Sequence, residues 1–106
     1  MTCAQQGDIL WLEKEEQYVL VLSREFFNQS GMSVVCPLRD KAKPDALHIE
    51  ISSDEYNGTA LLEHLRSLDL QARHYRRISG ISYEQIQDIA DAVQGIFDYY
   101  PYSTYT

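Results

Sequence analysis

The sequence predicts a mainly β domain with one C-terminal helix, and three observations support this fold class. Short apolar or alternating segments recur between residues 9 and 65, separated by charged links and turn residues. A single amphipathic segment follows them, in which Ile86, Ile89 and Val93 recur at helical spacing. The chain has 106 residues, which is enough for one core and one domain. Together these features predict a small β-barrel with a helical lid.

Two strands and a helical turn are predicted near the N-terminus. The continuous apolar run at 9–12 ends at the charged residues 13–16 and predicts a buried strand. Residues 18–22 are rich in β-branched and aromatic side chains, so they predict its antiparallel partner across that short link. Ser23 follows this strand and is suited to cap a single helical turn.

Three further strands are predicted in the middle of the chain. Residues 32–36 form the first, which we expect to end at Pro37 because proline cannot donate a backbone hydrogen bond. Residues 47–51 alternate with period two and predict a half-buried strand. Residues 59–65 predict another strand, and their leucine-rich composition leaves a helix as the alternative.

The clearest element is the final helix. Ser82 and Gln85 have the spacing of a capping box, and the apolar positions that follow lie on one helical face as far as Phe97. That face is expected to cover the sheet. We therefore predict one domain over residues 1–98 and a tyrosine-rich C-terminal tail over 99–106.

Charge and cysteine content limit the function classes. The chain carries 16 acidic and 9 basic residues, a net charge of −7, so nucleic-acid binding requires its few cations to gather on one face. They concentrate at 39–43 and 66–77. Cys3 and Cys36 form neither a disulfide framework nor a metal pair. The sequence shows neither a long apolar run nor a basic leader. We therefore expect a cytoplasmic protein that does not span a membrane and is not secreted.

Several segments carry a family resemblance when they are taken in order. They are Gly-Asp-Ile-Leu-Trp-Leu at 7–12, Val-Leu-Val-Leu-Ser at 19–23, Val-Val-Cys-Pro at 34–37, His-Ile-Glu-Ile at 48–51 and Leu-Arg-Ser-Leu-Asp at 65–69. In this order the chain resembles the MazF, PemK and Kid toxins of bacterial toxin–antitoxin systems. The resemblance implies a small SH3-like β-barrel of the MazF, PemK and CcdB kind, with a C-terminal helix and a two-fold homodimer.

The resemblance also implies an activity and partners. Toxins of this type cleave single-stranded RNA without a metal or other cofactor, using the 2′-hydroxyl as nucleophile. Their antitoxin places an extended acidic segment along the toxin dimer and occupies the RNA groove. A homodimer, an antitoxin with an acidic segment and single-stranded RNA are therefore the expected partners.

Two positions depart from the pattern of active members of this family. Those members carry an arginine in a glycine-rich loop between the first two strands, whereas here the link is short and Tyr18 stands near that position. Their threonine after Cys-Pro is also missing, because Leu38, Arg39 and Asp40 follow Pro37. Weak or absent RNA cleavage is therefore predicted. The alternatives are a non-catalytic binding protein and a CcdB-like poison of a protein target.

The candidate catalytic residues are Arg39, Glu63 and His64. Arg39 could replace the missing phosphate-binding arginine, and His64 could carry a proton. If residues 59–65 form a strand, Glu63 and His64 point to opposite faces and cannot act as a pair. The non-catalytic alternatives are a solvated charged loop around Arg39 and a hydrogen-bonded structural role for His64.

The candidate RNA-binding or antitoxin-binding residues are cationic: Arg39, Lys41, Lys43, Arg66, Arg73 and His74. For the last two, an edge strand with outward charges is an equal alternative. His48 and Glu50 are interpreted as surface residues. The three histidines lack the spacing of metal ligands, so no metal site is predicted. Trp11, Phe26, Phe27 and Cys36 are expected in the core.

Overall fold

The computed structural model describes residues 3–43 and 45–98, and the predicted tail at 99–106 lies outside them. The elements in these residues are the strands β1 (Asp8–Leu12), β2 (Gln17–Val21), β3 (Met32–Arg39), β4 (His48–Ser52), β5 (Asn57–Leu61), β6 (Arg66–Asp69) and β7 (Tyr75–Gly80), the helices α1 (Glu25–Asn28) and α2 (Tyr83–Phe97), and the 3-10 helix η1 (Leu62–His64).

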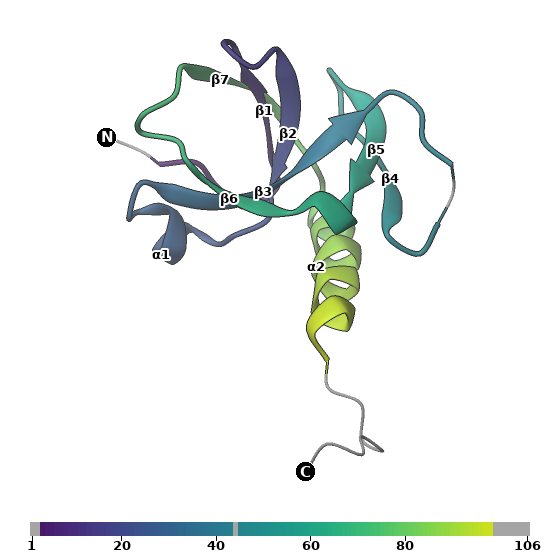
Figure 1. Cartoon of the computed structure of the whole chain (residues 1–106). Coiled ribbons are helices and arrows are strands. Elements are labelled where there is room, and N and C mark those ends of the chain that lie inside the picture. The colour runs from purple at the N-terminus through teal and green to yellow at the C-terminus, as the bar shows by residue number, and fades with distance from the viewer. Residues whose placement is uncertain (1–2, 44, 99–106) are drawn as a thin grey trace.

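The strands form one strongly curved antiparallel sheet, with the order β4-β5-β3-β2-β1-β7 and with β6 also paired to β3 (Figure 1). The first strand, β1, pairs with both its hairpin partner β2 and the last strand β7. The sheet is therefore a half-barrel, and α2 lies below it in Figure 1. This arrangement confirms the predicted mainly β fold with one C-terminal helix.

Strand β3 is the centre of the half-barrel because it pairs with three neighbours in turn. Its N-terminal part pairs with β6, its middle with β2 and its last two residues with β5. The prediction that Pro37 ends this strand was wrong. Pro37 pairs with Val19 of β2 and lies between Val35, the last residue paired with β6, and Leu38, the first paired with β5. A residue without an N–H is tolerated at this change of partner.

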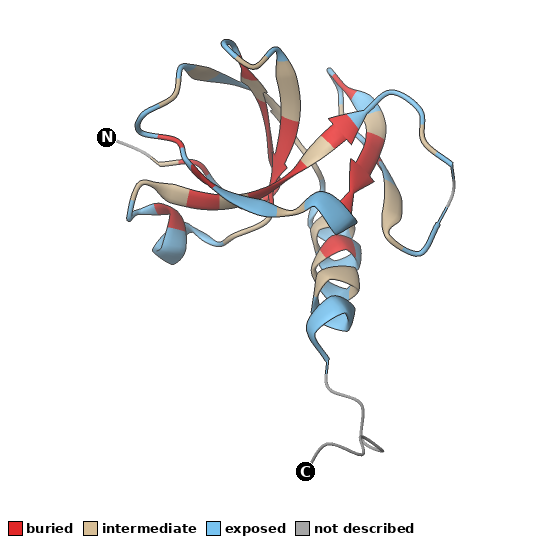
Figure 2. Ribbon diagram, in the orientation of Figure 1, coloured by how far each residue is buried: buried red, intermediate tan, exposed pale blue. Residues whose placement is uncertain are grey.

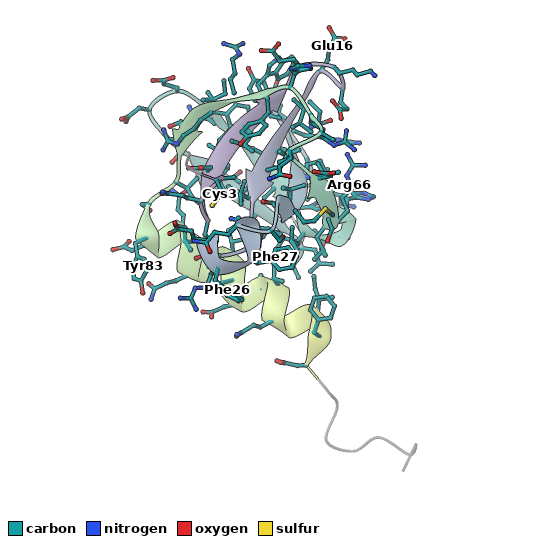
Figure 3. All side chains as sticks on the ribbon, turned by 90° about the vertical axis from the view of Figure 1, so that its left-hand side faces the viewer. Cys3, Glu16, Phe26, Phe27, Arg66 and Tyr83 are labelled. Carbon is teal, nitrogen blue, oxygen red and sulfur yellow. The ribbon has the colours of Figure 1, made fainter. Side chains whose placement is uncertain are left out.

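A four-residue link joins β1 to β2, as the sequence predicted. Leu12 pairs with Gln17, and Glu16 takes a left-handed backbone conformation with φ 55° to close the turn. This tip carries Glu16 at the end of the molecule farthest from α2 (Figure 3). The link is therefore a tight, acidic turn.

Two apolar clusters lie on the two faces of the sheet, which explains why β1 and β2 are continuously apolar. Ile9 faces one cluster, whereas Leu10 and Leu12 face the other. The first comprises Ile9, Leu20, Cys36, Leu38, Ile51, Tyr56, Ala60, Leu62 and Ile89. The second comprises Ala4, Leu10, Leu12, Val19, Val21, Val35, Leu68 and Leu70. Figure 2 shows that the buried residues are concentrated in the central strands.

Of the four residues predicted to lie in the core, three belong to neither cluster. Cys36 is fully buried, as predicted. Phe26 is 73% exposed and Phe27 is 38% exposed, so that prediction was wrong. Both lie on the one-turn helix α1, whose buried residue is instead Asn28. Trp11 is only half-buried because it lies near the end of the β1–β2 hairpin.

Helix α2 begins as predicted but covers the sheet over only part of its length. The Ser82 hydroxyl accepts a hydrogen bond from the backbone N–H of Gln85, which is the predicted cap. Ile89 is buried in the first cluster, whereas Ile96 is 40% and Phe97 is 70% exposed. The last turns project beyond the sheet (Figures 1 and 2). No helix in the described part of the chain has the length and apolar character needed to cross a membrane.

The segment predicted as a strand at 59–65 changes conformation in its middle. Strand β5 ends at Leu61, and residues 62–64 form the 3-10 helix η1. Leu62 is fully buried, so the turn is anchored by its first residue while Glu63 and His64 remain exposed. The alternating geometry assumed for Glu63 and His64 therefore does not apply.

Candidate functional site

Three of the predicted binding residues lie where β3 ends and the following loop begins. Arg39 is exposed and pairs through its backbone with Thr59 of β5. Lys41 and Lys43 follow on the exposed loop that leads to β4. Among residues 3–43 and 45–98, no ion pair involves any of these three cations. Their positive charge therefore lies exposed at the surface.

Arg66 lies on β6, the strand that pairs with the N-terminal part of β3. It is the first residue of β6 and pairs with Val35, four positions before Arg39 along β3. Its side chain is exposed and lies at the outer surface in Figure 3. Arg39 thus lies on β3, and Arg66 lies on a strand that pairs with β3.

The other arginines of the second cationic stretch, Arg73, Arg76 and Arg77, form ion pairs with carboxylates. Arg73 forms an ion pair with Glu15 of the β1–β2 turn, and its side chain is 34% exposed. Arg76 lies 3.5 Å from Glu13. His74 is exposed immediately before the edge strand β7. These positions support the edge-strand alternative for this stretch. The charge of Arg73 is already paired with that of Glu15.

The structure brings Glu63 together with His48, not with His64. Nε2 of His48 lies 2.6 Å from Oε2 of Glu63, and Nδ1 of the same ring lies 2.6 Å from the backbone oxygen of Lys43. These contacts raise the pKa of His48, the hydrogen bond with Lys43 having the largest effect and that with Glu63 the next. The hydrogen bond from His48 in turn lowers the pKa of Glu63.

Both ring nitrogens of His48 are therefore engaged by groups of the protein itself. His64 is exposed on η1 and remains the candidate proton carrier. The sequence interpretation of His48 as a surface residue beside Glu50 missed this pair. The signal that could have found it is the β4–β5 hairpin register, in which His48 pairs with Leu61, two residues before Glu63.

A row of aromatic rings crosses the half-barrel beside Arg39. Trp11 and Tyr18 have ring centroids 4.6 Å apart, and Tyr18 and Tyr56 are 4.7 Å apart. Burial, with smaller contributions from Asp40 and Tyr18, raises the pKa of Tyr56 to about 12. Its phenol therefore stays neutral at physiological pH.

Gly58 allows Tyr56 to pack closely against β3. A Cβ atom at this position would lie 2.6 Å from the Tyr56 hydroxyl and 2.7 Å from the backbone oxygen of Arg39. Glycine thus permits the contact between the β4–β5 turn and the end of β3. The aromatic row was not predicted from the sequence, because it depends on this tertiary approach.

An apolar cavity of about 200 Å³ lies between α2, the end of β2 and residues 6–7 that precede β1. Ile86, Ile89 and Val93 line it from the helix, and Leu20 and Leu22 line it from β2 and the residue that follows. Farther along the helix, Ile96 and Phe97 are exposed.

Within 3–43 and 45–98, no group of three His, Cys, Asp or Glu side chains could hold a metal ion. Cys36 is buried, and burial, with a smaller contribution from Glu63, raises the pKa of its thiol to about 12. It is therefore a packing residue and not a nucleophile.

Solved structures with the same architecture come from several toxin–antitoxin proteins. MazF in the MazE–MazF complex from Deinococcus radiodurans matches with a TM-score of 0.82 at 21% identity, covering 92% of this chain and 98% of that chain. An endoribonuclease from Mycobacterial species matches with a TM-score of 0.80 at 13% identity, covering 95% and 98%. The Mycobacterium tuberculosis toxin MazF-mt6 matches with a TM-score of 0.71 at 15% identity, covering 88% and 99%.

At these identities the structural matches establish the fold alone. A search of curated protein sequences gave no match. The family model for PemK-like, MazF-like toxins of type II toxin–antitoxin systems matches residues 5–97, which contain all the described strands and helices and both apolar clusters apart from Ala4. The chain therefore belongs to the PemK-like, MazF-like toxin family of type II toxin–antitoxin systems.

Proposed function

We propose that this protein is a toxin-family member that binds anionic partners but cleaves RNA weakly or not at all. The observation that carries the proposal is the four-residue link between β1 and β2. This link consists of Glu13, Lys14, Glu15 and Glu16 and contains no arginine. The resemblance to active toxins implies an arginine-bearing loop at this place.

The charge of the link supports the same conclusion. Three of its four residues are acidic, and the two nearby arginines that contact them, Arg73 and Arg76, are engaged in ion pairs. A phosphodiester that develops negative charge in the transition state needs a cation there, and removal of one such group typically costs ~10²–10³ in rate. A carboxylate-rich turn would instead repel the phosphate.

Anion binding would be retained at the cations on β3, on the loop that follows it and on β6. Arg39, Lys41, Lys43 and Arg66 are exposed and lack carboxylate partners among the described residues. Relatives have been crystallised as MazE–MazF complexes and with a cognate antitoxin. We therefore expect the partner of this protein to be an antitoxin with an extended acidic segment that lies along these cations.

The apolar cavity beside α2 supports a homodimer. An exposed apolar surface of this kind is costly in a monomer in water, and Ile96 and Phe97 are exposed farther along the helix. Light scattering coupled to size-exclusion chromatography should give a dimer mass for the parent. Phe97→Ser should shift the mass towards the monomer, whereas Lys14→Ser, on the distant hairpin tip, should leave it unchanged. A monomeric parent at micromolar concentration would reject the dimer.

RNA cleavage is tested directly with the purified protein. A long single-stranded RNA is incubated with the folded protein in EDTA, and the products are separated at single-nucleotide resolution. Little or no specific cleavage is expected. Cleavage at a defined short sequence would overturn the proposal, and Arg39→Ala and His64→Ala would then show which of these two residues carries it.

A further inference from the structure

A polar cluster next to the proposed anion-binding surface is centred on the titratable side chain of His48. We propose that protonated His48 pins the cationic segment, residues 40–43, to the half-barrel, and that loss of one proton from its ring releases this segment. The inference goes beyond the proposed function, because it concerns the order of a loop and needs neither RNA nor antitoxin.

The geometry requires two protons on the ring. Nδ1 of His48 contacts the backbone oxygen of Lys43, and Nε2 contacts a carboxylate oxygen of Glu63, both at 2.6 Å. A backbone carbonyl accepts hydrogen bonds and cannot donate them, and the same is true of an ionised carboxylate. Only the imidazolium ion has a proton on both nitrogens, so only that form satisfies both contacts.

Loss of one proton breaks one of the two contacts. If Nδ1 is left bare, two lone pairs face each other at Lys43 and the segment loses its attachment. If Nε2 were left bare, the Lys43 contact would survive, but the charge-assisted hydrogen bond to the Glu63 carboxylate is the stronger of the two, so the proton stays on Nε2 and Nδ1 is the nitrogen left bare. Either tautomer places an acceptor against an acceptor, so the neutral ring cannot hold the same position.

The attachment matters because the cationic segment has little else to hold it. Among the described residues, the His48–Lys43 contact is the one hydrogen bond that reaches residues 40–43. Lys41 and Lys43 are exposed, and neither forms an ion pair in that part of the chain. The position of these two cations therefore depends on His48.

The charges around the ring favour the protonated form. Glu63 lies on η1, Asp45 precedes β4, and Glu50 is two residues along β4 on the same polar side. Lys43 contributes its backbone oxygen to the contact, while its ammonium and any charge on His64 of η1 oppose protonation. The carboxylates outnumber these cations, and the net field stabilises the imidazolium.

The test compares the parent with Glu63→Gln, which is designed to remove the proton requirement. A glutamine amide can donate to bare Nε2 while neutral His48 donates from Nδ1 to Lys43, so both contacts survive without the second proton. The ¹⁵N chemical shifts of the His48 ring report its protonation. The rate of tryptic cleavage after Lys41, divided by that of a free peptide spanning 38–43, reports release of the segment.

In the parent, the ring should titrate above the usual histidine range. As it does so, cleavage after Lys41 should rise roughly twofold to fivefold, a modest change because the pair is partly solvent-exposed. Glu63→Gln should show slow cleavage at every pH, and His48→Ala should show fast cleavage at every pH. His64→Ala, which removes the neighbouring histidine, should show the same pH dependence of cleavage as the parent.

Two results would overturn the proposal. One is a parent ring that titrates at or below the usual histidine pKa. The other is a cleavage rate that stays constant while His48 loses its proton, since the ring would then not hold the segment. Neither outcome depends on whether the protein cleaves RNA or binds an antitoxin, so the proposed function stands or falls separately.

Discussion

Nε of Arg77 on the edge strand β7 donates to Oδ1 of Asp8 at 2.9 Å, and thereby ties the last strand of the sheet to the first. The other carboxylate oxygen, Oδ2, accepts from the backbone N–H of Gln5 at 2.9 Å. Asp8 itself is buried. A buried carboxylate is stable only with such partners, so this aspartate is expected to be important for closure of the sheet.

Replacing Arg77 should therefore destabilise the fold. Arg77→Ala leaves one oxygen of the buried Asp8 without its donor and should lower the free energy of unfolding by about 1–2 kcal/mol, reduced because the guanidinium is largely exposed. Urea denaturation monitored by tryptophan fluorescence measures this value. Arg76→Ala, which breaks only a long and exposed ion pair, is the control and should change stability by less than ~0.5 kcal/mol. Equal effects of the two variants would contradict the prediction.

Asn28 is expected to be the most sensitive polar residue of the N-terminal half. Its side-chain nitrogen donates to the backbone oxygens of Ala4 and Ser23, and its side-chain oxygen accepts from the hydroxyls of Ser23 and Ser33. Asn28→Ala leaves these buried partners unsatisfied and should cost about 2–3 kcal/mol. The adjacent Gln29→Ala is an exposed control. Thermal unfolding of both variants would test this, and similar melting temperatures would count against a central role for Asn28.

The two cysteines should react at very different rates. Cys36 is fully buried, and its pKa is raised to about 12, whereas Cys3 is half-buried. Iodoacetamide at pH 8, followed by mass spectrometry, should modify Cys3 in the native protein and Cys36 only in urea. Rapid native labelling of Cys36 would show that the first apolar cluster opens easily.

The same thiol gives a pH dependence of stability. Its pKa is near 9.0 when the chain is unfolded and about 12 when folded, so the folded state keeps its proton longer. Raising the pH above about 9 therefore favours the unfolded state, and stability should fall there. Cys36→Ala should remove this part of the decline while costing core packing at every pH. An unchanged slope between pH 8.5 and 10 in that variant would refute the assignment.

Charge reversal at the cations on β3 and β6 should weaken binding of an acidic peptide. Arg39→Glu with Arg66→Glu removes two exposed cations and adds repulsion, so affinity for an extended acidic segment should fall by at least tenfold at low salt. Arg73→Glu is not suitable for this purpose, because it would place two carboxylates together at Glu15. Calorimetric titration at two salt concentrations measures the effect. An affinity unchanged by the double reversal would place the partner elsewhere.

Regular patterns in the sequence predicted strands β1 to β5 and the C-terminal helix, but not β6 and β7. The apolar run at 9–12, the alternation at 47–51 and the Ser82 cap each correspond to an element that the structure contains. In each case the determinant is local, since side-chain spacing or one capping hydroxyl decides the conformation. Pro37 was misjudged because its tolerance depends on two neighbouring strands, which no local pattern encodes.

The candidate site was less predictable, for the same physical reason. The cations at 39–43 were found because charge is visible in the sequence. The pairing of His48 with Glu63 depends on the β4–β5 register and on the 3-10 helix that redirects the chain after Leu61. Likewise, the exposure of Phe26 follows from a one-turn helix that buries its asparagine instead.

The pairing of β1 with β7 has a consequence for how the chain acquires its structure. One side of β1 can form its ladder with β2 as soon as the hairpin exists, but the other side must wait for residues near the end of the domain. Contacts between segments so distant in sequence slow folding. During synthesis, the apolar first strand therefore keeps an open edge until almost the whole domain has left the ribosome, and incomplete chains are at risk of aggregation.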